Sequence, residues 1–94
     1  MKQEVFVIAL GGNALGGKKG NATISQQFHR TERAIESLVP LLKKEYNIVF
    51  TFGNGPQVGN ILIRMEAAIG KTYPLPLEVC VAESEGEIGY MIEQ

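Results

Sequence analysis

Residues 48–56 read IVFTFGNGP, and this stretch decides the fold. Ile48 to Phe52 is a short apolar run rich in β-branched and aromatic side chains, which predicts a strand. The run stops at Gly53-Asn54-Gly55, and Pro56 then occupies the first position of a predicted helix, where proline is well accepted. A strand that passes through a glycine loop into a helix is typical of an α/β layer fold.

A second strand of the same kind comes earlier in the chain. Val5 to Leu10 is continuously apolar, a pattern typical of a strand covered on both faces, and it ends at Gly11-Gly12-Asn13. The long crossover between the two strands favours a parallel pair, so we predict an α/β fold with a parallel sheet. Because two strands make a poor sheet by themselves, at least one strand edge should lack its partner.

The sequence between the two strands predicts a loop followed by a helix. Residues 16–21 are glycine-rich and polar, which indicates a surface loop. Thr23 and Gln26 fit a capping box at the start of the helix. Pro40 should kink or divide this helix near its last turn, because proline removes a backbone donor. The apolar stripe that would face the core consists of Phe28, Thr31, Ile35, Leu38 and Leu42.

Two more helices are predicted beyond the second glycine loop. The helix that opens at Pro56 should end near Gly70, a natural C-terminal stop. Residues 77–94 predict a further helix. Its Gly86 and Gly89 lie on one side, where a neighbouring backbone could approach closely.

Composition excludes several classes of partner and site. The net charge of −1 gives no footprint for nucleic acid or for an anionic membrane. All ten acidic residues are Glu, so the chain offers no Asp for a magnesium site. The single cysteine, Cys80, suits a reducing cytosol and is interpreted as a buried, inert thiol. No targeting or membrane-spanning segment is evident.

The two glycine loops are the candidate binding site. Ligands of open parallel sheets bind beyond the carboxyl ends of the strands, where Gly11-Gly12-Asn13 and Gly53-Asn54-Gly55 both lie. Glycine lets backbone N–H groups turn toward an anion and lets the ligand approach closely. The alternative is that both loops are only tight strand exits. If they form one site, a structure should place them side by side.

Other candidates are weaker. Gly12 to Lys18 reads as a near P-loop, but Lys19 replaces the hydroxyl residue that would hold magnesium, so we reject it. Val58 stands where a dinucleotide fingerprint requires its third glycine. His29 has no Cys or Asp partner and is interpreted as a surface residue. Lys18 and Lys19 could reach a phosphate, and the alternative is a solvated pair. The glutamates Glu83, Glu85 and Glu87 are best explained as a solvated face.

Four segments together resemble carbamate kinase, of the amino-acid kinase family. They are residues 7–14, 53–60, 76–80 and 88–91, which read VIALGGNA, GNGPQVGN, PLEVC and IGYM. Ala9 stands where it does in carbamate kinases, whereas the related acetylglutamate and uridylate kinases commonly have a lysine at that position. The chain departs from the family at Phe52, where His is usual, and at Glu83 and Glu85.

The resemblance implies a function and a division of the site. Residues 1–94 would be the N-terminal, carbamate- and phosphoryl-binding part of an α/β parallel-sheet kinase, with the nucleotide-binding C-terminal half absent. Gly11, Gly12 and Asn13 would bind the transferred phosphoryl group, while Gly53, Asn54 and Gly55 would bind carbamate. ATP or ADP with magnesium would bind outside this segment. The lysines that neutralise charge would also lie beyond it, so no catalytic residue is assigned and no metal ligand is expected here.

The implied enzyme interconverts ATP plus carbamate with ADP plus carbamoyl phosphate, in the ATP-forming direction of arginine catabolism. It would be cytoplasmic and homodimeric, and the isolated segment would be inactive. Two rival interpretations stay open. One is an amino-acid kinase relative that acts on a different carboxylate. The other is a truncated, non-catalytic binding or assembly module.

Overall fold

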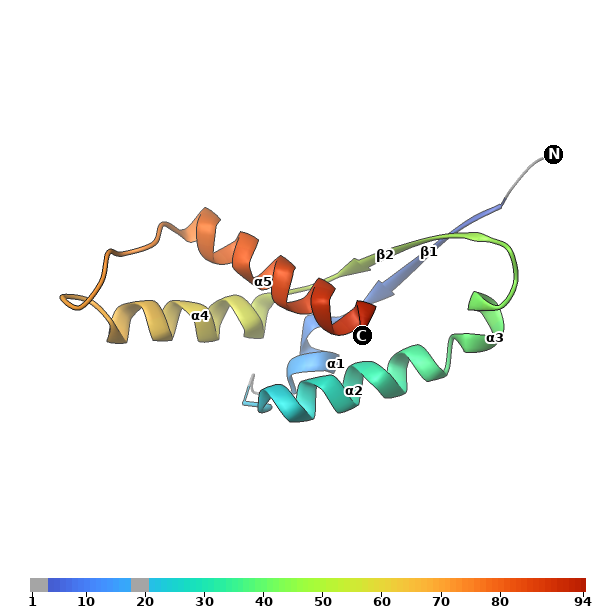
Figure 1. Ribbon diagram of the computed structural model, residues 1–94, viewed down its shortest axis with the longest axis horizontal. Coiled ribbons are helices and arrows are strands. Elements are labelled where there is room, and N and C mark those ends of the chain that lie inside the picture. The colour runs from blue at the N-terminus through green and yellow to red at the C-terminus, as the bar shows by residue number, and fades with distance from the viewer. Residues whose placement is uncertain (1–3, 18–20) are drawn as a thin grey trace.

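A parallel pair of strands forms the sheet of this chain. The computed structural model describes residues 4–17 and 21–94. Strand β1 (Val5–Leu10) pairs in parallel with β2 (Asn47–Phe52), with Val5 opposite Asn47 and Leu10 opposite Phe52 (Figure 1). The predicted strands and their parallel pairing are confirmed. Both glycine loops therefore leave the same end of the sheet.

The sheet is covered on one face only within the described residues. Side chains along both strands alternate between exposed and half-buried positions. Val5, Val7 and Val49 are 60%, 66% and 48% exposed. The burial on both faces that the apolar pattern predicts for these strands is therefore not provided by the described residues. An unbroken apolar run shows what a strand would bury in a complete layer, but the helices of this segment shield only the alternate positions.

A short helix follows β1 where the sequence indicated only a strand exit. Helix α1 (Gly12–Gly16) begins directly after Gly11, whose carbonyl oxygen accepts from Ala14 N at 3.1 Å and Leu15 N at 3.3 Å. The helix places Leu15 in the core at 1% exposure, and this burial outweighs the poor helix propensity of glycine. The helix ends at Gly17, which has a φ of +85° that favours glycine. Lys18, Lys19 and Gly20 lie outside the described residues.

The crossover forms two helices rather than one. Helix α2 (Ile24–Glu36) opens with the predicted capping box, in which Gln26 N donates to Thr23 Oγ1 and Thr23 N donates to Gln26 Oε1. A separate helix, α3 (Val39–Leu42), then begins, with Pro40 in its first turn. The predicted division at Pro40 is confirmed, because proline is tolerated in a first turn but not inside a helix.

The second half of the chain is a pair of helices, α4 (Gly55–Ala67) and α5 (Leu77–Glu93), which lie against each other (Figure 1). Pro56 is the second residue of α4, one position later than predicted. Gly70 has a φ of +86° just beyond α4, as expected for a helix stop. A Cβ at Gly86 or Gly89 would meet no atom within 4 Å, so the described residues make no close backbone approach there.

The core is small and sits where α1, α2 and α5 meet. Its buried centre consists of Leu15, Ile88 and Met91, and Phe28, Phe52 and Ile92 pack around it. The radius of gyration is 15.7 Å, against about 12 Å for a compact domain of this length. The elongated shape leaves large side chains such as Ile63, Tyr73 and Leu77 exposed. In the described part of the chain, no helix combines the length and the apolar character needed to cross a membrane.

Candidate functional site

The two glycine loops are in direct backbone contact at the carboxyl end of the sheet. Gly53 N donates to Leu10 O at 3.0 Å, which extends the ladder between the strands by one residue. A Cβ at Gly12 would lie 2.5 Å from the carbonyl oxygen of Gly53 and 3.0 Å from Asn54 N. The predicted convergence of the loops is confirmed.

The glycines of these loops divide into an inner and an outer pair. Gly12 and Gly53, the inner pair, lie so close that each leaves no comfortable space for a side chain on the other. Gly11 and Gly55, the outer pair, would each carry a Cβ into open space. Gly11 also has an ordinary extended backbone, with φ −75° and ψ 135°. The strand-exit explanation therefore accounts for the inner pair, but nothing in the described residues requires glycine at the outer pair.

Helix α4 begins in this site without a side-chain cap. Asn54 is its N-cap residue, a type that usually accepts a hydrogen bond from the first turn, yet it makes no such bond. Its Nδ2 instead donates to Ser84 Oγ of α5 at 2.8 Å, and Ser84 Oγ donates to Val81 O at 2.6 Å. The positive end of a helix of 13 residues is thus left without a capping side chain, which is the arrangement that binds anions.

Gln57 supports the site from beneath, and the sequence did not single it out. Its side chain is 1% exposed, and Nε2 donates to Gly12 O at 3.3 Å and lies 3.5 Å from Gln27 Oε1. Gln27 in turn donates to Ala22 O at 3.0 Å. These contacts tie α4 to α1 and α2. The signal that would have found Gln57 is its position one turn before Ile61, on the apolar stripe of its helix.

The remaining candidates lie away from the two loops or outside the described residues. His29 is exposed and lines a polar hollow of about 860 Å³ together with Arg30 and Arg33. Glu83 and Glu85 are exposed, on either side of the buried Ser84. Glu83 lines a separate hollow of about 480 Å³ with Ile61 and Met65 of α4, and neither glycine loop contributes to it. The predicted role of Lys18 and Lys19 falls on residues that the structure does not describe. By its backbone, Asn13 belongs to α1.

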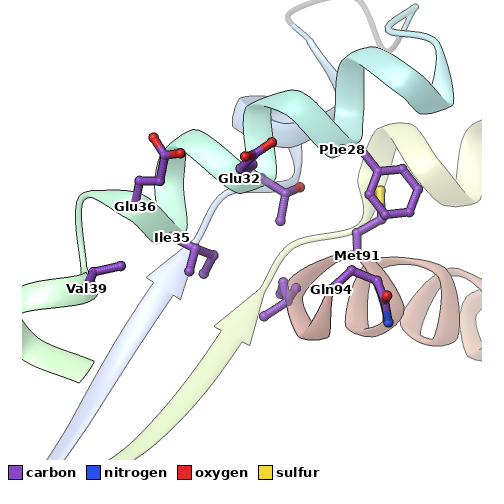
Figure 2. Close-up of a pocket in the computed structure, with 9 residues that line it drawn as sticks. Phe28, Glu32, Ile35, Glu36, Val39, Met91 and Gln94 are labelled. Atoms are coloured by element: carbon purple, nitrogen blue, oxygen red, sulfur yellow. The ribbon is translucent and has the colours of Figure 1, made fainter. Parts of the chain in front are cut away.

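Three glycines of the two loops, Gly11, Gly53 and Gly55, are exposed, whereas Gly12 is buried. An apolar hollow of about 380 Å³ lies elsewhere, between α2, α3 and the end of α5, with Phe28, Ile35 and Met91 in its wall (Figure 2). Neither glycine loop contributes to that hollow. Among the described residues, no three His, Cys, Asp or Glu side chains gather in a group that could hold a metal ion. The chemistry that the loops offer is therefore backbone hydrogen bonding to an anion.

Comparison with known proteins identifies the family that this arrangement resembles. No protein-family model matches the chain. Carbamate kinase 2 of Staphylococcus aureus is 44% identical over 92 residues, which cover 97% of this chain and 29% of that protein. Carbamate kinase of Pyrococcus horikoshii is 39% identical over 93 residues, with 97% and 30% covered. A structure of carbamate kinase from Giardia lamblia bound to AMP-PNP has a TM-score of 0.86 and 42% identity, and covers 96% of this chain and 32% of that one. The chain thus spans about 30% of the length of the curated relatives it matches.

Proposed function

Because this chain matches the N-terminal part of carbamate kinases in sequence and fold, we propose that it supplies the acceptor side of a carbamate kinase. The reaction is phosphoryl transfer between ATP and carbamate, giving ADP and carbamoyl phosphate. Residues 1–94 form the carbamate- and phosphoryl-binding part of the enzyme, and the nucleotide is bound by residues outside them. In arginine catabolism the enzyme would run in the ATP-forming direction.

The contact between the two glycine loops is the observation that carries this proposal. Gly11, Gly12 and Asn13 bind the phosphoryl group, while Gly53, Asn54 and Gly55 bind the carboxylate of carbamate. The uncapped start of α4 at Gly55 supports an anion in the second loop. The open space at Gly11 and Gly55 supports a ligand that passes close to the backbone. Phosphoryl transfer depends mainly on positioning and electrostatics, and a fixed contact between the loops sets the spacing of donor and acceptor.

The nucleotide and its magnesium belong to the part of the enzyme outside this chain. A relative binds AMP-PNP, and the fold of that relative extends well beyond the portion matched here. The residues described here do not fit a magnesium site, because the chain has no Asp and the described part has no suitable ligand group. In carbamate kinases of the proposed type, magnesium would neutralise charge on the nucleotide phosphates. The catalytic lysines are likewise assigned to residues beyond this segment.

We further propose a cytoplasmic homodimer that uses small-molecule substrates only. Its dimerisation through this region is supported by the exposed large side chains on the outer surface of the chain, such as Ile63, Ile69 and Tyr73. Light scattering measures the mass in solution. A stable monomer at micromolar concentration, without exposed apolar surface detected by a hydrophobic dye, would contradict the dimer.

The outer glycines give a direct test of the function in the full-length protein. Gly11→Ala and Gly55→Ala should each lower ATP formation from carbamoyl phosphate and ADP by about tenfold or more, because a Cβ displaces a closely bound ligand. Gly59→Ala is the matched control, since a Cβ there also meets nothing within 4 Å but lies outside both loops. Normal turnover in both loop variants would refute the site. A panel of other carboxylates would show whether carbamate is the preferred acceptor.

A further inference from the structure

Gln57 has an unusual hydrogen-bonding state for a side chain with 1% exposure. Its Nε2 donates to Gly12 O at 3.3 Å, but its Oε1 is buried with no partner within the described residues. A buried acceptor without a donor costs free energy, and a methionine or leucine of similar volume would avoid that cost. Such exceptions need a physical explanation.

Exchanging the oxygen and nitrogen of the Gln57 carboxamide does not give the buried oxygen a donor. The flipped amide would point its oxygen at Gly12 O and at Gln27 Oε1, which are both acceptors. The neighbouring backbone also leaves room for this end of the carboxamide. A Cβ at Gly16 would lie 2.9 Å from Gln57 Nε2, so glycine at that position leaves room for the amide. The donor end of Gln57 is therefore the end that the surrounding residues accommodate.

The group that Gln57 holds is the peptide unit between Gly12 and Asn13. This unit is planar and trans, so its C=O and its N–H point in opposite directions. When Gln57 holds Gly12 O in the interior, the N–H of Asn13 is fixed in the opposite direction. The same unit lies beside the contact between Gly12 and Gly53, so its orientation is set relative to both loops.

We propose that Gln57 is a positioning residue that orients the Asn13 N–H for an oxyanion bound in the first glycine loop. The ligand class is a tetrahedral oxyanion, such as a phosphoryl group or sulfate. This inference rests on the proposed function. The unpartnered Oε1 is the cost of holding a side-chain donor against Gly12 O.

The test uses the chain itself and separates loop order from stability. Gln57→Met removes both the donor and the unpartnered acceptor at nearly constant volume. The control is Thr31→Val, which removes a buried hydroxyl of α2 that donates to Gln27 O at 2.8 Å and not to Gln57 or the loop. A second variant, Gly16→Ala, displaces the Gln57 amide without removing it. The measurements are 15N relaxation at Gly12 and Asn13, the urea midpoint, and sulfate affinity from amide shifts.

We expect Gln57→Met to lower the order parameters of Gly12 and Asn13 while the urea midpoint stays equal or rises. Its dissociation constant for sulfate should increase by about tenfold, the effect of losing an oriented donor. Thr31→Val should leave the order parameters of Gly12 and Asn13 and the sulfate affinity of the folded protein unchanged. Gly16→Ala should disorder the same two amides as Gln57→Met.

Two results would separate this inference from the proposed function. Unchanged order at Gly12 and Asn13 in both Gln57→Met and Gly16→Ala would overturn the positioning role, whatever binds. If the order falls as expected but the wild-type chain binds no sulfate, the positioning role stands and the anion site of the proposed function is refuted.

Discussion

The inner and outer glycines of the same two loops lie in different surroundings. Gly12 and Gly53 pack backbone against backbone, and Gly12 is buried. Gly11 and Gly55, each one or two residues away, are exposed and have free space where a side chain would be. The inner pair is thus explained by folding alone. The outer pair is explained only when something outside the described residues occupies the space.

This difference changes how a glycine loop should be tested. A substitution at an inner glycine disturbs the fold together with any binding, so a loss of activity there is ambiguous. A substitution at an outer glycine leaves the contacts of the chain intact, so it reports on the ligand. The comparison therefore assigns stability to one pair and recognition to the other.

The largest expected effect is at Gly12. Gly12→Val should lower the free energy of unfolding by about 3 kcal/mol or more, because the new Cβ would meet the Gly53 carbonyl group at 2.5 to 2.7 Å. Since Gly12 is buried and not on an open surface, this variant does not test binding alone. Urea denaturation followed by circular dichroism measures the change. A variant as stable as wild type would show that the loops separate easily, and the distinction between inner and outer glycines would fail.

A smaller effect is expected at Ser84, which holds the side chain of Asn54 away from α4. Ser84→Ala should cost about 1 kcal/mol of stability, because Asn54 Nδ2 loses its acceptor. The released Asn54 side chain can then cap α4 and compete with a bound anion, so sulfate affinity should fall several-fold.

The matched control for Ser84 is Ser37→Ala. Ser37 Oγ donates to Ala34 O at 2.7 Å on the exposed surface, far from either loop in the sequence. Ser37→Ala should leave the sulfate affinity unchanged in a calorimetric titration. Equal affinity in Ser84→Ala and wild type would mean that the cap position of α4 has no part in binding.

A substitution in the capping box of α2 changes the stability of the protein at a position outside the loops. Thr23→Ala should lower the free energy of unfolding by about 1 kcal/mol, because the first turn of α2 loses the acceptor of Gln26 N. Sulfate affinity of the folded protein should not change. If sulfate affinity fell in parallel with stability, any destabilising substitution would weaken binding. The loop variants would then not show that the loops themselves bind the anion.

The sequence predicted those parts of the fold that depend on local pattern. The apolar runs at β1 and β2, the capping box at Thr23 and the break at Pro40 each have a short-range physical cause, and all are confirmed. Helix α1 was missed because glycine-rich residues favour loops, whereas the burial of Leu15 is a tertiary effect. The exposure of one sheet face could not be predicted from the strands, because an apolar strand pattern does not say which segment provides the cover.

The candidate site was predicted in part for the same reason. Parallel strands fix the end at which both glycine loops emerge, so their convergence follows from topology. The links from Asn54 to Ser84 and from Gln57 to Gly12 join residues 30 and 45 positions apart. No local pattern encodes such pairs. The division of the glycines into inner and outer pairs likewise depends on which backbone packs against which.

The most direct test of the central claim is whether one molecule of carbamoyl phosphate, which carries both groups, contacts both loops. Carbamoyl phosphate is titrated into the 15N-labelled chain while the amide resonances of Gly12 and Gly55 are followed. A shared site predicts that both resonances shift along one isotherm with a single dissociation constant. It also predicts that Gly11→Ala, in the first loop, weakens the response of Gly55 in the second. Shifts confined to one loop, or two different dissociation constants, would contradict a shared site.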